Sequence, residues 1–258
     1  GTEHMILSKT PFRIPFAGGL TDLKPYAQVY GGVTVSATID KYLYVGLKPN
    51  VDGYINLKYM DVHEKVADIK GVRHPLVREA MRLLGLENEA LDIYIMTDLN
   101  SESGLGSSGA VAVGLLNAMH GYIGETVTRE QLLDEASRIE VDILEGASGY
   151  HDPSICALGG LRLIEYNETG VTHRAITLEN GFRERFEDSL LFFYEGVHAK
   201  SKPSLDLLHA EIDSAKPILD EMKATAYSLE EAFRAENIPD IAALIQKQQD
   251  LKQQLPGK

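Results

Sequence analysis

The chain has 258 residues, of which 44% are hydrophobic and 24% charged, and this composition is typical of a folded globular protein. Its 25 Lys and Arg against 38 Asp and Glu give a net charge of −13, which argues against non-specific binding to nucleic acid or to an anionic membrane. A single cysteine, Cys156, excludes an internal disulfide and a cysteine-based metal cluster. No apolar run has the length of a membrane span and no signal peptide is visible, so we expect a cytoplasmic protein.

The first hundred residues predict mainly strands. Gly1–His4 resemble the remainder of a tag, and β-branched or aromatic runs with short connections follow, for which we expect antiparallel pairing within the first 60 residues. Gly31 closes a segment that predicts a loop or a short helical turn. Apolar residues at helical spacing predict a helix over 74–86. The predicted strands are 5–17, 33–39, 41–49, 54–59 and 91–99.

The second half of the chain predicts more helix. Residues 107–123 are apolar on nearly every side, which indicates a central helix. Thr128 and Gln131 form a capping box that opens a second helix, ending at Gly146. Further strands are predicted at 159–166 and 189–196, and mostly helix from Ser204 onward. Strands early and helices late predict an α+β protein with a change of domain near residues 180–190.

A glycine-serine loop stands immediately before the predicted central helix. Residues 103–108 read Ser-Gly-Leu-Gly-Ser-Ser, and Ser107 or Ser108 is suited to cap that helix. Flexible glycines and the unpaired N–H groups of a first helical turn favour an anion site. The loop is neither a Walker A sequence nor a Rossmann fingerprint. An ordinary capped helix is the alternative interpretation.

Two acidic residues further along are suited to phosphoryl transfer, which requires positioning, Mg²⁺ and a carboxylate near the attacking hydroxyl. Glu140 is a candidate magnesium ligand, or else a solvent-facing helix residue. Asp152 precedes a proline and fits an N-cap, and a carboxylate held there also suits a general base. His151 and His198 are more ordinarily structural or solvent-facing. Cys156 is expected to be a small buried residue.

Four motifs in order resemble one superfamily. The glycine-serine loop resembles the second signature of the GHMP kinases, the superfamily of galactokinase, homoserine kinase, mevalonate kinase and phosphomevalonate kinase. Residues 9–45 closely resemble the opening of the D-glycero-D-manno-heptose 7-phosphate kinases, Arg-Ile-x-Phe-Ala-Gly-Gly-x-Thr-Asp. Residues 74–81 and 138–160 also follow the order and spacing of that subfamily. Together the motifs cover most of residues 9–165 and predict a GHMP sugar kinase.

The resemblance implies a fold and two cofactors. The fold is the α+β GHMP kinase fold, with a ribosomal protein S5 domain 2-like N-terminal domain over 5–185 and a ferredoxin-like C-terminal domain over 186–258. The last glycine-rich motif of the family does not occur in this sequence. The implied cofactors are ATP and Mg²⁺. The ATP-binding residues implied are Ser103, Gly104, Leu105, Gly106, Ser107 and Ser108.

The resemblance also implies roles for single side chains. Asp152 matches the catalytic base, and Arg13 matches a cation that keeps this base ionised and helps to neutralise the transferring phosphoryl group. Asp22 matches a contact to a sugar hydroxyl. Ser108 and Glu140 complete the magnesium site. The implied substrate-binding residues are Gly18, Gly19, Thr21, Asp22 and His151.

The chain departs from the heptose kinase pattern at the acceptor side. Tyr150 and His151 stand where that subfamily has Lys-Gln, and the glycine triplet is completed here by Leu20. Residues 197–204 replace a Thr-Arg-x-Ala motif, which leaves Lys200 and Lys202 as candidates to hold a sugar phosphate.

The predicted activity is transfer of the γ-phosphate of ATP to the anomeric hydroxyl of D-glycero-D-manno-heptose 7-phosphate, giving the 1,7-bisphosphate. An unphosphorylated fucose, galactose or mannose acceptor is the first alternative, and a non-catalytic nucleotide-binding relative is the second. We expect a small sugar or sugar phosphate as the partner, with no nucleic acid and no membrane, and a heptose or lipopolysaccharide pathway as the setting. Whether the protein forms a homodimer is left open.

Overall fold

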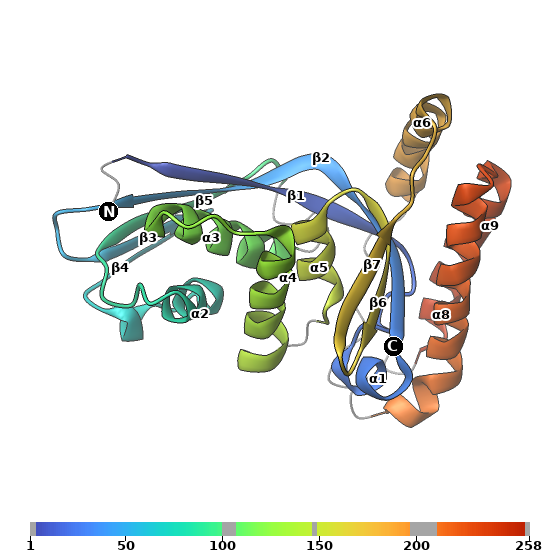
Figure 1. The fold of residues 1–258 in the computed structure, drawn as a ribbon, viewed down its shortest axis with the longest axis horizontal. Coiled ribbons are helices and arrows are strands. Elements are labelled where there is room, and N and C mark those ends of the chain that lie inside the picture. The colour runs from blue at the N-terminus through green and yellow to red at the C-terminus, as the bar shows by residue number, and fades with distance from the viewer. Residues whose placement is uncertain (1–3, 100–106, 146–148, 197–210, 256–258) are drawn as a thin grey trace. The chain divides into compact units, whose positions relative to one another are not determined.

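The computed structural model describes residues 4–99, 107–145, 149–196 and 211–255 (Figure 1). Within them the strands are β1 (Ile6–Ala17), β2 (Gly32–Pro49), β3 (Ile55–Tyr59), β4 (Val62–Val66), β5 (Leu91–Thr97), β6 (Leu161–Asn167) and β7 (Gly170–Ala175). The helices are α1 (Lys24–Tyr30), α2 (Pro75–Leu83), α3 (Ser107–Ile123), α4 (Arg129–Ser137), α5 (His151–Leu158), α6 (Asn180–Gly196), α8 (Ile212–Arg234) and α9 (Ile238–Gln253). A 3-10 turn and a π-helical turn lie at Ile69–Gly71 and Arg138–Ile143.

The chain divides into two compact units, each built from several segments. Unit 1 consists of Gly1–Arg13, Thr38–Gly146 and Asp152–Gly159, and unit 2 of Ile14–Ala37, Ala147–His151 and Gly160–Lys258. Strands β1 and β2 and helix α5 therefore contribute residues to both units. The predicted boundary between residues 185 and 186 concerns the domains of the family and stays a prediction.

The strands of unit 1 follow the order β4-β3-β5-β2. β3 and β4 pair antiparallel, from Ile55 opposite Val66 to Tyr59 opposite Val62, as a short connection requires. β3 runs parallel to β5, because the chain between these two strands is long enough to hold β4 and α2. β2 pairs antiparallel with β5 along residues 43–49.

Helix α3 is the central helix of unit 1, as its apolar sequence predicts. It packs beside α2 and α4 (Figure 1). A Cβ atom at Gly114 would lie 3.2 Å from the side chains of Leu43 and Val45, so this glycine lets α3 lie close on β2. Leu115 and Leu116 are fully buried. Burial of such side chains is the main source of stability here, at about 1.5–3 kcal/mol for each.

Thr128 caps α4 as predicted, but the Gln131 side chain bonds Glu135 and does not complete the capping box. The Thr128 side chain accepts a hydrogen bond from the backbone N–H of Gln131 at 3.1 Å. The α-helix ends at Ser137, and the chain continues as the π-helical turn Arg138–Ile143. The prediction of one helix up to Gly146 is therefore wrong, because an α-helix and a π-helical turn follow each other. The predicted strand runs at 33–39 and 41–49 form one continuous strand, β2, and the predicted short helical turn is α1.

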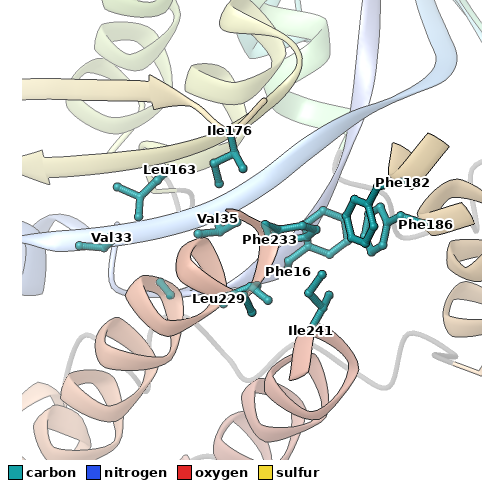
Figure 2. Close-up of a cluster of buried hydrophobic side chains, with 13 residues drawn as sticks. Phe16, Val33, Val35, Leu163, Ile176, Phe182, Phe186, Leu229, Phe233 and Ile241 are labelled. Carbon is teal, nitrogen blue, oxygen red and sulfur yellow. The ribbon is translucent and has the colours of Figure 1, made fainter. Parts of the chain in front are cut away.

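Unit 2 has its own core of buried aromatic and aliphatic side chains (Figure 2). The first part of β2 pairs antiparallel with β6, from Gly32 opposite Tyr166 to Ala37 opposite Leu161, and β6 pairs antiparallel with β7. Helices α8 and α9 pack against each other. The rings of Phe186 and Phe233 meet edge to face with centroids 5.0 Å apart, a favoured aromatic geometry.

The predicted strand at 189–196 is wrong, because these residues continue α6. Phe182 and Phe186 lie four residues apart, their rings stack with centroids 6.3 Å apart, and both are buried in the core of unit 2. This spacing places both rings on one helical face, and the helix that they anchor extends to Gly196. A short apolar run does not by itself distinguish strand from helix.

The helical C-terminal region is confirmed over residues 211–255 by α8 and α9. Asn237 caps α9, since its side chain accepts the backbone N–H of Asp240 at 3.1 Å. Among the helices of the described ranges, none is both long and apolar enough to cross a membrane.

Candidate active site

In unit 1, the structure brings together the two residues predicted for catalysis. Arg13 lies on β1 and Asp152 lies in the first turn of α5. Arg13 Nε donates to Asp152 Oδ1 at 2.6 Å, and the two side chains are only 10% and 18% exposed. A charge-assisted bond of this length fixes the orientation of the carboxylate and favours its ionised form. The catalytic roles of both residues remain predictions.

The first turns of α3 and α5 lie against each other in unit 1. A Cβ atom at Gly109 would lie 2.6 Å from the carbonyl carbon of Asp152 and 2.7 Å from its Cβ. Only glycine therefore allows this approach, which brings the first turn of α3 beside the Asp152 carboxylate. Two helix N-termini in one place favour an anion.

Most of the predicted phosphate loop lies outside the described residues. Its residues Ser103, Gly104, Leu105 and Gly106 are not described. The candidate phosphate anchors Lys200 and Lys202, and also His198, lie outside the described residues as well. α3 begins at Ser107, so Ser107 and Ser108 belong to its first turn, and their side chains are not described.

Glu140 lies in the π-helical turn that follows α4. Its side chain is only 3% exposed, so the alternative of a solvent-facing residue is wrong. Burial raises the pKa of the Cys156 thiol, the charges of Asp152 and Glu140 raise it further, and Arg13 lowers it. All three charged groups therefore lie within electrostatic range of one buried thiol on α5. Cys156 itself is the buried apolar residue that the sequence predicts.

The residues of this cluster fit a magnesium ion. Carboxylate and hydroxyl oxygens are the hard ligands that Mg²⁺ prefers, and it commonly uses one or two carboxylates together with phosphate oxygens and water. Glu140 would supply such a carboxylate from a π-helical turn, a conformation frequent at functional sites. Within the described ranges, no group of three His, Cys, Asp or Glu side chains is arranged to hold a metal ion by itself.

In unit 2, the predicted substrate residues Gly18–Asp22 form a tight turn. Gly18 has φ +80°, and a Cβ atom there would lie 1.8 Å from the Val33 carbonyl oxygen, so this position requires glycine. The Thr21 hydroxyl lies 2.7 Å from Gly18 O and 3.0 Å from Val33 O, and it accepts the Val33 N–H at 2.9 Å. Thr21 is fully buried, so its side chain holds the turn on β2, and a direct substrate contact by it stays a prediction.

Asp22 fixes the beginning of α5. Its Oδ2 accepts the His151 N–H at 3.0 Å, and its carbonyl oxygen accepts the Tyr150 N–H at 3.4 Å. A Cβ atom at Gly149 would lie 2.0 Å from Asp22 Oδ2, so the chain approaches this carboxylate closely only because residue 149 is glycine. α5 starts at His151 rather than after Asp152, because Asp22 accepts the first N–H in place of the predicted Asp152 N-cap. The His151 side chain is buried.

Gln248 of α9 is a candidate that sequence reasoning missed. Its Oε1 accepts the Gly18 N–H at 3.0 Å, and the residue is only 6% exposed. One signal was available, because Gln248 lies seven residues after Ile241 and three before Leu251, on the buried face of an amphipathic helix. A glutamine on the buried face is unusual and indicates a polar partner.

Unit 1 also contains a hollow that the sequence did not predict. It has a volume of about 350 Å³ and lies where β3 and β5 end, just before the glycine-serine loop in the chain. Its walls are mainly apolar and aromatic, with Lys58 as the charged exception. The lining residues are Lys58, Tyr59, Met60, Tyr94, Ile95, Met96 and Thr97.

The chain is similar to known proteins in sequence and in fold. Residues 73–160 match the family described as GHMP kinases N terminal domain. A D-glycero-alpha-D-manno-heptose 7-phosphate kinase of Campylobacter jejuni is 22% identical over 90% of this chain and 72% of its own length. An L-fucokinase/L-fucose-1-P guanylyltransferase of Bacteroides fragilis is 24% identical over 95% of this chain, which spans 30% of that longer protein. A D-glycero-D-manno-heptose 1-phosphate kinase from Bacteroides thetaiotaomicron has the same fold, with a TM-score of 0.77, 20% identity and coverage of 97% and 80% of the two chains.

The fold and the matched domain together define a phosphotransferase that uses an alcohol group as acceptor. Within this class, residues 73–160 match the N-terminal domain of the GHMP kinases, a family of ATP-dependent enzymes, and the chain shares the α+β fold of a heptose phosphate kinase.

Proposed function

We propose that the protein is an ATP- and Mg²⁺-dependent sugar kinase that phosphorylates the anomeric hydroxyl of D-glycero-D-manno-heptose 7-phosphate and yields the 1,7-bisphosphate. The observation that carries the proposal is the Arg13–Asp152 pair beside the first turn of α3. Supporting it, the Campylobacter jejuni relative that aligns with 90% of the chain bears the name of this activity.

Asp152 is the general base of the proposed reaction. Its carboxylate, oriented by Arg13, accepts the proton of the acceptor hydroxyl as that oxygen bonds to the γ-phosphorus and the bond to the β,γ-bridging oxygen breaks. ADP carries away the electron pair of the broken bond. Arg13 also opposes the negative charge of the transferring group. Positioning and charge neutralisation are the main contributions that phosphoryl transfer requires of a protein.

The other candidate residues of unit 1 are assigned to the nucleotide. Bound ATP would supply the phosphoryl group, and Mg²⁺ would neutralise the negative charge on the phosphate oxygens. Residues 103–108 and the first-turn N–H groups of α3 are assigned to the phosphates, and Ser108 and Glu140 to Mg²⁺. The hollow beside Tyr59, Met60 and Met96 has the size and the apolar lining suited to a flat base.

In unit 2, the Gly18–Asp22 turn and His151 are assigned to the sugar. The closed turn presents its main chain and one carboxylate, which suits a polyhydroxylated ligand. A cytoplasmic location, a sugar or sugar phosphate as partner, and the absence of nucleic acid and membrane partners remain predictions.

A second candidate acceptor is an unphosphorylated sugar. Tyr150 stands where the heptose kinase pattern has lysine, and its ring stacks on Tyr166 with centroids 6.3 Å apart. An uncharged ring provides a surface for a sugar face and no attraction for a phosphate. The relative from Bacteroides fragilis bears the name of a fucokinase, which also favours this acceptor class.

The test is an ADP-release assay with Mg·ATP and a panel of heptose 7-phosphate, mannose, galactose and fucose. Turnover confined to the heptose phosphate is the expected result. Turnover of fucose or another bare sugar, with none for the heptose phosphate, replaces the proposal with the second candidate. ATP binding without turnover of any sugar overturns both in favour of a non-catalytic relative.

A further inference from the structure

We infer that Gln248 of α9 is a specificity-determining residue of the acceptor site, whose side-chain amide donates a hydrogen bond to a hydroxyl or ring oxygen of the sugar. The inference rests on the proposed function, because it takes the Gly18–Asp22 turn as part of the acceptor site. It adds a residue from the C-terminal helix of unit 2 to that turn.

The orientation of the Gln248 amide follows from its partner. The Gly18 N–H is a donor, so the atom that faces it at 3.0 Å is the acceptor Oε1. The other end of the amide, Nε2, then faces Gly19, where a Cβ atom would lie 3.8 Å from it. No other described atom beyond the neighbouring residues lies within 4 Å of that position. The amide donor therefore borders open space at Gly19.

The burial of Gln248 indicates that its side-chain amide has a hydrogen-bonding role. The residue is 6% exposed, and buried amides in native proteins normally have hydrogen-bond partners at both ends. Among the described residues, the structure shows one hydrogen bond for this side chain, the one that Oε1 accepts. An amide donor that borders open space is available to a ligand oxygen, whereas an apolar residue at this position would offer no hydrogen bond. A ligand oxygen in the space at Gly19 supplies the acceptor.

The same turn also carries an acceptor, the carboxylate of Asp22. Gly18 is bound to Gln248 on one side and to Thr21 on the other, and Asp22 follows Thr21 directly. An amide donor and a carboxylate acceptor on one turn match a sugar, because each of its hydroxyls both donates and accepts. Both groups belong to unit 2.

The variant Gln248→Glu separates the two ends of the side chain. A glutamate keeps an oxygen for the Gly18 N–H but replaces the donor by a second acceptor close to the turn that carries Asp22. We expect the Kd and KM for the acceptor sugar to rise about 10-fold, as for one lost hydrogen bond with added charge repulsion, and the KM for ATP to stay unchanged. Gln253→Glu, at an exposed position of the same helix, is the matched control and leaves both constants unchanged.

A second variant tests the inference even if Gln248→Glu does not fold. Gly19→Ala places a methyl group at ordinary contact distance from Nε2 and without backbone strain, so the protein folds while the space for the sugar is filled. We expect a similar rise in the KM for the sugar.

The readouts are calorimetric binding of the panel sugars and the KM for each substrate. Unchanged sugar affinity in both variants overturns the inference, and so does a parallel rise in the KM for ATP. Absence of any sugar binding by the unaltered chain also overturns it. Sugar binding without turnover in the unaltered chain refutes the proposed function alone.

Discussion

Unit 1 and unit 2 hold their candidate residues by different physical means. In unit 1, two opposite charges face each other at 2.6 Å in a largely buried place, and Glu140 adds a third buried charge. In unit 2, neutral groups of Thr21 and Gln248 hold the Gly18–Asp22 turn through its main chain. A group that takes a proton must be kept ionised and oriented, whereas a turn that contacts a ligand must keep its shape.

This difference leads to different expectations for the two units. Neutralising a charge in unit 1 removes an interaction used in the transition state, so it lowers kcat. Altering the turn of unit 2 changes how the sugar is bound before reaction, so it raises the KM for the sugar. The Gln248 and Gly19 variants test the second expectation, and the substitutions below test the first and its structural basis.

The largest effect is expected for Asp152→Asn. Asparagine still accepts a hydrogen bond from Arg13 but accepts no proton at neutral pH, so we expect kcat to fall about 10³-fold while the KM for the sugar changes little. The ADP-release assay measures both constants. Asp52→Asn, at an exposed position of unit 1, is the control and keeps full activity. A variant that retains more than about a tenth of kcat would show that Asp152 is not the base.

A smaller effect, on stability, is expected for Gly109→Ala. The added methyl group would lie 2.6 Å from the carbonyl carbon of Asp152 and 2.7 Å from the Pro153 nitrogen, and these backbone atoms cannot move away as a flexible side chain can. We expect the free energy of unfolding to fall by about 3 kcal/mol and kcat to fall with it, measured by urea denaturation and the same assay.

Gly181→Ala is the matched control for this substitution. Residue 181 lies in α6, and a Cβ atom there meets nothing within 4 Å. Alanine should therefore leave stability unchanged or raise it by up to about 1 kcal/mol. Equal stability of the two variants contradicts the close approach of α3 and α5.

Local sequence patterns predicted many of the elements, although they missed β4 and β7 and gave a strand in place of the end of α6, and they did not predict the long-range contacts. The N-cap at Thr128 and the central position of α3 follow from neighbouring residues, and both are confirmed. The bond between Gly18 and Gln248 joins residues 230 positions apart, and that between Asp22 and His151 joins residues 129 apart. No period or spacing reports such pairs, because they exist only once the tertiary fold has formed. The Arg13–Asp152 pair was predicted only because the motifs resembled a known family.

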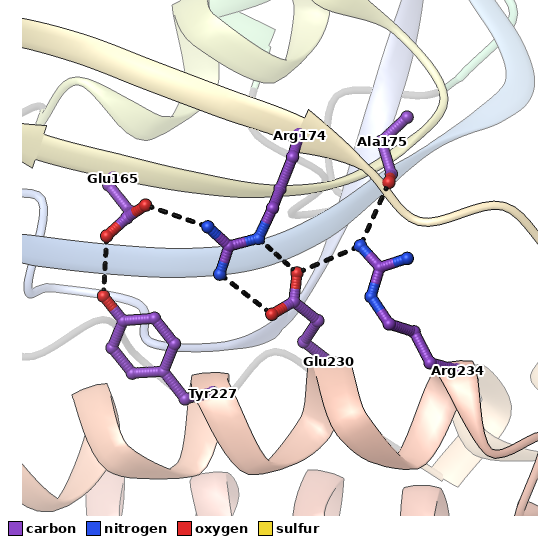
Figure 3. A network of polar contacts seen from close by, with 6 residues as sticks. All are labelled: Glu165, Arg174, Ala175, Tyr227, Glu230 and Arg234. Atoms are coloured by element: carbon purple, nitrogen blue, oxygen red, sulfur yellow. Dashed lines mark hydrogen bonds and ion pairs between the residues drawn. The ribbon is translucent and has the colours of Figure 1, made fainter.

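The charged network around Arg174 in unit 2 serves the fold rather than the candidate site (Figure 3). Arg174 of β7 binds Glu230 of α8 through two nitrogens, at 2.6 and 2.9 Å, and Arg234 reaches the same carboxylate at 3.3 Å. The hydrogen bond from Arg174 lowers the pKa of Glu230 below 4.5, against the opposite effect of burial, with Arg234 assisting. Arg174 is about half exposed, in contrast to Arg13.

The smallest effect is therefore expected for Glu230→Gln. Because the pKa of Glu230 is lower in the folded than in the unfolded chain, its stabilising contribution is complete above about pH 4.5 and is lost as the pH falls further. We expect the variant to lose about 1 kcal/mol of unfolding free energy at pH 7, since Arg174 is exposed enough for water to screen the pair. Urea denaturation at pH 7 and pH 3.5 measures the loss, with the exposed Glu168→Gln as control. A loss that is equal at both pH values would assign the role of Glu230 to packing, and the contrast between the two units would then rest on Arg13 and Asp152 alone.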